Sequence, residues 1–169
     1  MAFLPVELTV AERRTLRDIA DYQFGAGAGE ALFTPDSALS VTRATNGRPR
    51  QLHDETGRRV TVGQDGRLTL GFAGGRRLID ALEPPAYRVV VGDESEPFVS
   101  DGENAFAKFV QSVDPVIRGG DEVLVVHDQD DRLLAVGRAE LSATGMLDFE
   151  RGMAVKVREG RDEWANRED

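Results

Sequence analysis

Apolar residues near the start of the chain follow the spacing of a helix. They recur three or four positions apart, at Leu16, Ile19, Ala20 and Phe24. Thr9 and Glu12 stand three residues apart, which is the spacing of a capping box at the start of a helix. The two patterns together predict a helix that begins after Thr9 and presents one apolar face.

Between residues 39 and 72 the apolar positions shift to the spacing of short strands. Four runs fit this spacing, at residues 39–44, 50–53, 60–62 and 68–72. Short turns rich in Gly, Asn and Asp separate the runs, so we predict an antiparallel sheet. A helix is predicted over 74–82, and the prolines at 84 and 85 cannot continue it. We therefore expect a first domain at 1–85.

The second half of the chain has a strand pattern with two helical segments inserted. Strands are predicted at 89–91, 105–113, 122–127, 133–141 and 153–158, and helical segments at 93–99 and 142–149. Short strands with a few small helices are typical of a mixed barrel. We therefore predict an α+β chain with a second domain at 86–160. Residues 161–169 are mostly charged and are expected to form a disordered tail.

The composition excludes several classes of protein. There is no cysteine, so disulfides, thiolate catalysis and cysteine-based zinc sites are ruled out. No apolar stretch approaches the roughly 20 residues that a membrane helix needs. The start of the chain lacks the basic residues of a signal peptide. We expect a cytoplasmic protein that does not associate with membranes.

Charge is distributed unevenly along the chain. The net charge is −9, and all of it falls in residues 87–169, because residues 1–86 hold eleven bases and eleven acids. Within the first half, residues 43–77 hold eight arginines and three acids, which indicates a basic patch for phosphate. The alternative is that these arginines cover exposed strand faces.

Lysine is nearly absent from the chain. Of the twenty-one bases, Lys108 and Lys156 are the two lysines and the other nineteen are arginine. An acid-rich, lysine-poor surface suits a cytoplasm of very high salt, because short carboxylates hold water and cations well. We therefore expect a halophilic archaeal source. A GC-rich genome, which favours arginine codons, is the alternative.

Motifs that could carry catalysis are weak. GAGAG at 25–29 has the composition of a phosphate loop, but a helix precedes it where a dinucleotide motif needs a strand. We interpret it as a joint between two helices. His53 and His127 lie in different domains, and neither has an acid cluster or a second histidine at metal-binding spacing. The acids at 128–131 are interpreted as a hairpin turn. We expect no catalytic residues, no cofactor and no metal.

Several strings resemble a known pair of domains. They include FAKFV (106–110), DPVIRGGDEVLVV (114–126), GRAELSATGM (137–146) and RGMAVKVREG (151–160). These resemble the PUA domain, a small RNA-binding barrel. Residues 20–78 resemble the domain that precedes it in archaeosine tRNA-guanine transglycosylase and archaeosine synthase. The resemblance implies a PUA-like mixed barrel after an α+β domain, and a grip on the acceptor stem of tRNA. The transglycosylase's catalytic barrel, with its nucleophilic aspartate and zinc ligands, has no counterpart in these 169 residues.

The resemblance also points to residues that would contact RNA. PUA-like domains present RNA with the loop after their first helix and with their last strand, here 102–109 and 153–158. The candidates are Gly102, Phe106, Lys108, Lys156 and Arg158, with Arg118 as a weaker one. A second patch would use Arg48, Arg50, Arg76 and Arg77 of the first domain.

The candidate loop has three kinds of contact to offer. Gly102 has no side chain to keep a phosphate from the backbone, and Lys108 carries a charge for it. In a strand, Phe106 and Lys108 would share one face and Phe109 would take the other. At least one phenylalanine is therefore expected in the core, and an exposed one could stack on a base.

Two functions agree with these observations. The first is non-catalytic binding of structured RNA, above all tRNA, as an accessory to tRNA modification, with a modification enzyme as a further partner. The second is a PUA-fold module that has lost RNA and docks on a modification enzyme or the ribosome. The charge of −9 opposes RNA binding in ordinary salt, but such repulsion is screened within about 3 Å at 1 M salt.

Overall fold

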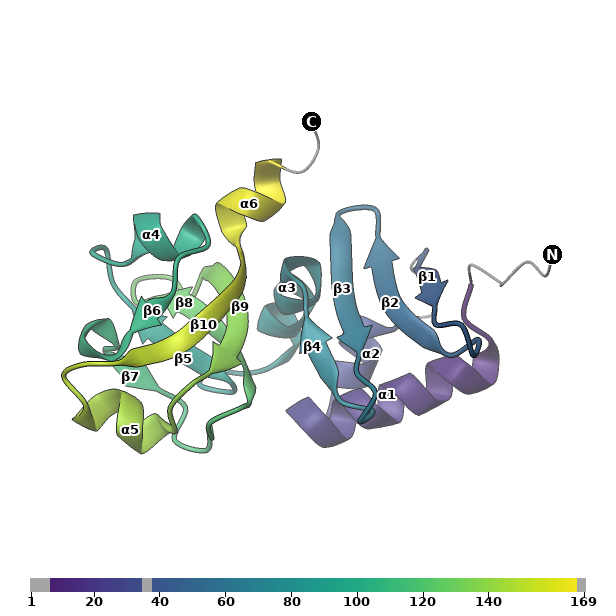
Figure 1. Cartoon of the computed structure of the whole chain (residues 1–169), viewed down its shortest axis with the longest axis horizontal. Helices are drawn as coiled ribbons and strands as arrows, with labels where there is room; N and C mark the ends of the chain where they lie inside the picture. The colour runs from purple at the N-terminus through teal and green to yellow at the C-terminus, as the bar shows by residue number, and fades with distance from the viewer. Residues whose placement is uncertain (1–6, 35–37, 167–169) are drawn as a thin grey trace. The chain divides into compact units, whose positions relative to one another are not determined.

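The computed structural model describes residues 7–34 and 38–166. The chain divides into two compact units, Met1–Leu82 and Glu83–Asp169 (Figure 1). This division lies three residues before the domain boundary expected after residue 85. Each unit has its own sheet.

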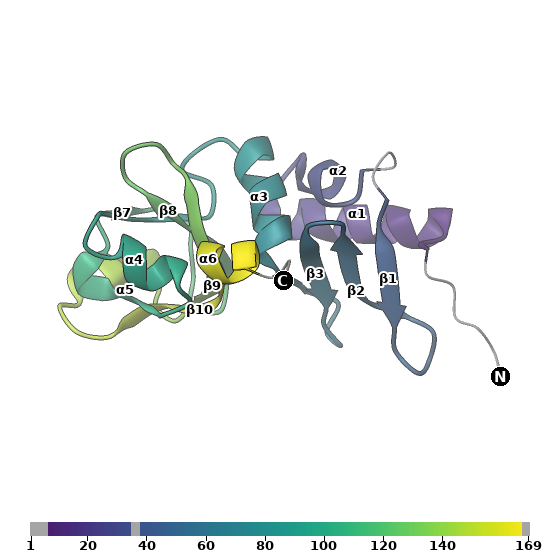
Figure 2. The same ribbon diagram turned by 90° about the horizontal axis from the view of Figure 1, so that it is seen from above.

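The first unit combines helices with a four-stranded antiparallel sheet. The helices are α1 (Val10–Phe24), α2 (Ala28–Leu32) and α3 (Phe72–Ala81). The strands, in sheet order, are β1 (Ser40–Arg43), β2 (Pro49–Asp54), β3 (Gly57–Val62) and β4 (Leu68–Leu70). The three helices lie on the same side of the sheet (Figure 2). The predicted antiparallel sheet with helices is confirmed.

Helix α1 begins where the sequence predicts. The Thr9 hydroxyl accepts a hydrogen bond from the Glu12 N–H at 3.1 Å, and Glu12 Oε1 accepts one from the Thr9 N–H at 3.0 Å. These two bonds complete the capping box. The helix ends before Gly25, whose φ of 107° is a conformation that glycine adopts readily. The GAGAG segment is therefore a joint between α1 and α2, as predicted.

A side chain closes the open edge of this sheet at β4. Gln23 Nε2 donates to the Leu68 carbonyl at 2.8 Å, and Gln23 Oε1 accepts from the Leu68 N–H at 2.8 Å. The Gln23 amide thus takes the place of a neighbouring strand and covers backbone groups that could otherwise pair with another chain. The same contact ties α1 to the sheet.

The second unit is a mixed sheet that curls into a half-barrel. In sheet order, its strands are β6 (Ala105–Phe106), β10 (Met153–Gly160), β9 (Leu133–Ala139), β8 (Glu122–His127), β5 (Arg88–Val91) and β7 (Ser112–Val113). Its helices are α4 (Glu96–Ser100), α5 (Ala143–Asp148) and α6 (Arg161–Ala165). Strands β5 and β8 run parallel and the other neighbours antiparallel. This confirms the mixed barrel. None of the described helices is long and apolar enough to cross a membrane.

The strand predicted at 105–113 is wrong in its middle. A 3-10 turn, η1 (Ala107–Phe109), separates β6 from β7. The two short strands lie at opposite ends of the sheet, because β6 pairs with β10 and β7 pairs with β5. One segment of the chain thus pairs with both ends of the curled sheet. It has to bend between them, which an unbroken strand cannot do.

The disordered tail predicted at 161–169 is also wrong over the part that the structure describes. Helix α6 forms there, and its Trp164 is half-buried. Glu163 Oε1 accepts a hydrogen bond from the Gly160 N–H at 2.9 Å, which caps the helix. Residues 167–169 lie outside the described residues.

Candidate nucleic-acid interface

Two segments that are far apart in the sequence form one surface of the second unit. Phe106 of β6 lies opposite Met153 of β10, and the Ala107 N–H donates to the Gly152 carbonyl at 3.0 Å. Residues 106–109 are thereby held against the turn that precedes β10. The sequence placed RNA contacts in both segments, and the structure brings the two segments together.

The hollow between these segments has aromatic and basic walls. We name it the aromatic hollow; it measures about 700 Å³ and is lined by Phe106, Lys108, Phe109, Glu150, Arg151 and Gly152. Phe106 is 47% exposed, so its ring is open to a stacking base. The Lys108 ammonium lies 4.9 Å from the centre of the Phe109 ring, within range of a cation–π contact.

The expectation that Phe106 or Phe109 lies in the core is wrong. Phe106 is exposed, and Phe109 is half-buried against the Lys108 side chain. The prediction failed because η1 replaces strand geometry after Phe106, and side chains in a 3-10 turn do not alternate between two faces. The buried residue of this turn is Ala107.

Most bases of the second unit are neutralised by acids. Ion pairs hold Arg88, Arg132, Arg138, Arg158 and Arg161. Among the described residues of this unit, the bases without an ion pair are Lys108, Arg118, Arg151 and Lys156. Two of these four line the aromatic hollow. A base without an ion pair can bind phosphate without giving up an internal acid, so these four are the strongest candidates.

Arg151 is a candidate that the sequence analysis missed. It is exposed and lies in the turn before β10. The resemblance predicts RNA contacts in the strand at 153–158. Arg151 lies in the turn just before that range. The usable signal was the arginine–glycine pair before the strand, because Gly152 has a φ of 119° and marks a tight turn.

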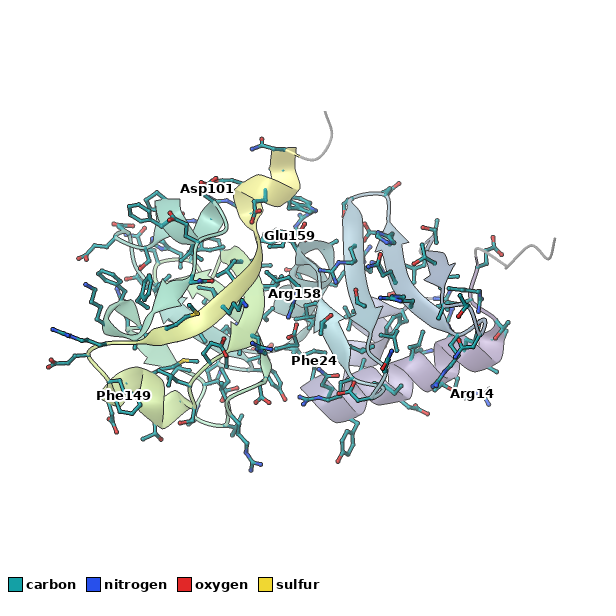
Figure 3. All side chains as sticks on the ribbon, viewed as in Figure 1. Arg14, Phe24, Asp101, Phe149, Arg158 and Glu159 are labelled. Carbon is teal, nitrogen blue, oxygen red and sulfur yellow. The ribbon has the colours of Figure 1, made fainter. Side chains whose placement is uncertain are left out.

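Arg158, labelled on β10 in Figure 3, forms an ion pair with an internal acid. Its Nη1 and Nη2 lie 2.5 and 2.8 Å from the two carboxylate oxygens of Glu122, whose side chain is 5% exposed. This bidentate pair joins β10 to β8 across β9 and neutralises the guanidinium. The structure thus gives Arg158 a structural partner, which weakens its case as a phosphate contact.

The other three candidates of this unit differ in their surroundings. Lys156 and Arg118 are exposed but line neither wall of the aromatic hollow. Gly102 has a φ of 100°, which suits a glycine. However, the Glu163 carboxylate of α6 lies where a Cβ of residue 102 would stand. A phosphate approaching Gly102 would meet that carboxylate first, so the surroundings of Gly102 do not favour the role predicted for it.

The eight arginines at 43–77 do not form one basic surface. The side chains of Arg43 and Arg59 are 4% and 1% exposed, and each pairs at 2.7 Å, with Glu12 and Asp54 respectively. Hydrogen bonds from Arg43 lower the pKa of Glu12 to about 2. Burial lowers the pKa of the Arg59 guanidinium. These two arginines hold the first unit together and are not available to a ligand.

The four arginines predicted as a second patch lie in two places. Arg48 and Arg50 line one hollow together with the β3–β4 turn. Arg76 and Arg77 stand on α3, which follows the other end of β4. All four are exposed. The structure therefore brings the first two together but does not join all four in that hollow.

The expectation that no acids accompany His127 is wrong. Its Nε2 lies 2.7 Å from Asp93 and 4.0 Å from Glu96, and the three side chains could hold a metal ion. His127 Nδ1 lies 3.1 Å from both the Gln129 nitrogen and Asp128 Oδ1, and its Nε2 lies within hydrogen-bond distance of Asp93. Glu96 is paired with Arg132, so a cation already occupies its carboxylate. Sequence spacing could not reveal the cluster, because Asp93 is 34 residues from His127.

Comparison with known families assigns both units. Residues 14–85 match the patch-forming domain C2 of tRNA-guanine transglycosylase, and residues 87–161 match the PUA domain. The chain is thus a C2 domain followed by a PUA domain, and the resemblance inferred from the sequence is confirmed.

The relatives that carry the same pair are archaeal enzymes. The chain is 46% identical over 156 residues, 92% of its length, to a tRNA-guanine(15) transglycosylase of Methanothermobacter thermautotrophicus. It is 48% identical over 146 residues, 86% of its length, to that of Pyrococcus furiosus. Each match covers 24% of the relative, so the chain spans about a quarter of the length of these curated relatives.

Solved structures share the fold over most of the chain. A hypothetical protein from Pyrococcus horikoshii OT3 has a TM-score of 0.66 at 21% identity, covering 90% of this chain and 92% of that one. A conserved PUA domain protein from Thermoplasma acidophilum has a TM-score of 0.58 at 23% identity, covering 85% and 89%. At these identities the likeness supports the fold alone.

Proposed function

We propose that this chain is a non-catalytic RNA-binding protein that grips tRNA at its acceptor stem and serves tRNA modification. The observation that carries the proposal is the aromatic hollow, where Lys108 and Arg151 lie beside the exposed ring of Phe106 and neither makes an ion pair with any residue that the structure describes. The two bases would pair with backbone phosphates, and an unpaired base would stack on the ring.

The comparisons support the tRNA part of this proposal. The relatives are named tRNA-guanine(15) transglycosylase and are 40–48% identical over 86–93% of this chain. The shared part is the C2 and PUA pair, so we assign to this chain the holding of RNA and not the exchange of a base. Archaeosine formation, which the resemblance implies, is the modification that we propose it assists.

The net charge of −9 determines the conditions under which binding is tested. We propose that the protein works in the cytoplasm of a halophilic archaeon, where concentrated salt screens long-range repulsion from RNA. Salt also reduces the gain from counterion release. Affinity then depends on close contacts such as those in the aromatic hollow.

Fluorescence anisotropy of tRNA labelled at its 5′ end tests the proposal in multimolar potassium chloride. Saturable binding is expected, and the double variant Lys108→Glu, Arg151→Glu should weaken it about 100-fold, because two charged contacts become repulsive. The matched control is Arg14→Glu, Arg17→Glu, which changes the net charge equally on α1 and should weaken binding less than about threefold. Equal losses in the two double variants would refute the interface.

The second candidate function is a protein-docking module, and one observation in the C2 domain favours it. Three hollows that share lining residues form a trough along α1, under the β1–β2 and β3–β4 turns. Its floor is apolar, with Ile19 and Val62 half-buried in it, and Tyr22 at its edge is 95% exposed. Apolar walls of this kind suit a peptide segment better than a phosphate backbone.

Co-purification after nuclease treatment separates the two functions. If docking through the trough is the function, a modification enzyme or a ribosomal protein stays bound without RNA, and Ile19→Glu with Tyr22→Glu releases it. The Lys108→Glu, Arg151→Glu variant serves as the control and should retain that partner. Loss of all partners on nuclease treatment would leave RNA binding as the function.

A further inference from the structure

A histidine and two carboxylates meet in the second unit, apart from the aromatic hollow. His127 ends β8, Asp93 lies in the turn after β5, and Glu96 begins α4. Strands β5 and β8 run parallel, and Val91 is the register partner of His127, so the chain that leaves β5 passes the end of β8. The fold thereby brings one nitrogen or oxygen from each of the three side chains within 4.8 Å of the other two.

The distances among these side chains suit one shared metal ion. His127 Nε2 lies 2.7 Å from Asp93 Oδ1 and 4.0 Å from Glu96 Oε1. Zinc binds nitrogen and oxygen at about 2.1 Å, so two of its ligand atoms lie about 3.4 Å apart in a tetrahedron. The two observed distances lie on either side of that value. The Asp93 side chain is 76% exposed, so its carboxylate has room to rotate into a ligand position.

The charges around His127 also favour a cation. The carboxylates of Asp93, Glu96 and Asp128 all lie within 4.0 Å of its buried imidazole. Glu96 uses one oxygen, Oε2, for its ion pairs with arginines, and its other oxygen, Oε1, faces His127. Among the described residues, Asp93 and Asp128 make no ion pair with an arginine or a lysine. A divalent ion at Nε2 supplies positive charge that these acids otherwise lack.

The second ring nitrogen of His127 has the partner that is usual in a metal-binding histidine. Nδ1 lies 3.1 Å from Asp128 Oδ1. With its proton on Nδ1, the ring donates to this carboxylate and turns the lone pair of Nε2 toward Asp93 and Glu96. The Gln129 nitrogen, also 3.1 Å from Nδ1, donates to the ring in the other tautomer. A carboxylate behind a buried imidazole recurs in zinc sites, and here it is a different acid from the two in front.

We propose that His127, Asp93 and Glu96 bind one divalent transition-metal ion, with Asp128 orienting the imidazole. One nitrogen and two oxygens suit zinc, because magnesium and calcium prefer oxygen ligands alone. Three protein ligands leave one position of a tetrahedral ion for water. The exposed side of Asp93 gives the ion a path from solvent. The ion fastens the start of α4 to the end of β8, so it stabilises the second unit and does not depend on RNA.

Calorimetric titration of the untagged full chain with zinc chloride, after dialysis against EDTA, tests the proposal. We expect one site per chain with a Kd of about 10 µM or lower, and magnesium chloride should bind at least about 100-fold more weakly. Zinc at 100 times its Kd should raise the melting temperature by at least about 5 °C. Absence of zinc binding, or similar binding of zinc and magnesium, would refute the site and leave the proposed RNA-binding function untouched.

Matched variants separate this site from general binding to an acidic surface. Asp93→Asn removes a ligand and should weaken zinc binding at least about tenfold. Glu94→Gln removes the same charge from an exposed position outside the three ligands and should change the Kd less than about twofold. His127→Gln should abolish binding, whereas His53→Gln, in the first unit, should leave it unchanged. Equal losses in the Asp93 and Glu94 variants would overturn the assignment.

The role of Asp128 has its own readout. Asp128→Asn should weaken zinc binding about tenfold without changing the stoichiometry, because the imidazole loses the carboxylate that orients it. Nitrogen NMR of the zinc-bound wild-type protein should show the His127 proton on Nδ1. An unchanged affinity in Asp128→Asn, together with a His127 proton on Nε2 in the zinc-bound protein, would overturn coordination through Nε2.

Discussion

The C2 and PUA domains differ in how their formal charge relates to the bases that they expose. The C2 domain has a run of eight arginines at 43–77, but two of them, Arg43 and Arg59, are buried and neutralise internal acids. The PUA half of the chain has all of the net charge of −9, but its two lysines are exposed and make no ion pair within the described residues. The arginine run therefore offers less charge than its count suggests, and Arg48, Arg50, Arg76 and Arg77 are the exposed arginines that the sequence singled out in it.

The difference shows that formal charge and available charge are separate quantities. Acids in the PUA domain are matched to arginines at short range, as in the pair of Arg158 with Glu122. The bases that remain are few, and two of them, Lys108 and Arg151, lie in the aromatic hollow. An acidic protein can therefore present a basic site where bases without ion pairs lie together.

The largest effect is expected from removing the buried arginine of the C2 domain. Arg59→Met leaves the Asp54 carboxylate, which is 8% exposed, without its ion pair at 2.7 Å. We expect the free energy of unfolding to fall by about 4 kcal/mol, because a buried charge is left uncompensated. Urea unfolding of the variant measures this loss. Arg50→Met, at an exposed arginine of the same sheet, should cost less than about 0.5 kcal/mol; similar losses in both would contradict the distinction.

The next largest effect is expected at the internal pair of the PUA domain. Arg158→Glu places a second carboxylate beside Glu122, whose side chain is 5% exposed, and should lower the free energy of unfolding by about 3 kcal/mol. Lys156→Glu, two residues earlier on β10, is exposed and should cost less than about 0.5 kcal/mol. Thermal unfolding of both variants separates a structural base from an available one. If the Arg158→Glu protein is stable but no longer binds tRNA, Arg158 contacts RNA and is not a structural residue.

Elements that depend on local sequence were predictable. The capping box at Thr9 and the strand at 122–127 appear in the structure as the sequence indicated, because both depend on residues a few positions apart. The break of the predicted strand 105–113 was not predictable in this way. It follows from the closure of the half-barrel, in which β6 and β7 pair with opposite ends of the sheet.

The candidate site was predictable in part, and for a similar reason. Lys108 could be chosen from composition and resemblance, and it makes no ion pair within residues 7–34 and 38–166. The engagement of Arg158 could not be foreseen, because Glu122 is 36 residues away along the chain. The Glu163 carboxylate lies beside Gly102 because helix α6 forms. The charged composition of residues 161–169 did not predict this helix.

A pH titration tests the same comparison through Glu12, an acid that Arg43 neutralises. The hydrogen bonds and charge of Arg43 hold the pKa of Glu12 at about 2, below its ordinary 4.5. A lowered folded-state pKa stabilises the protein above pH 4.5, and this stabilisation is lost as the pH falls from 4.5 to 2. Glu12→Gln should therefore cost about 1–2 kcal/mol at pH 7 and almost nothing at pH 2. Urea midpoints across this range measure the difference, and a pH-independent difference would contradict the role of the ion pair.

The smallest effect is expected from the exposed arginines of the C2 domain. Arg48→Gln with Arg50→Gln removes two bases that line one hollow, and it should change the free energy of unfolding by less than about 0.5 kcal/mol. If these arginines only flank the RNA, tRNA affinity falls about threefold, against about tenfold for Lys108→Gln. The salt dependence adds a second measurement, because each lost phosphate contact lowers the slope of log K against log salt by about one. A larger loss from the arginine pair than from Lys108 would move the main RNA contact from the PUA domain to the C2 domain. The arginine run, which stands out in the sequence, would then contribute more to tRNA affinity than Lys108, which the structure favours.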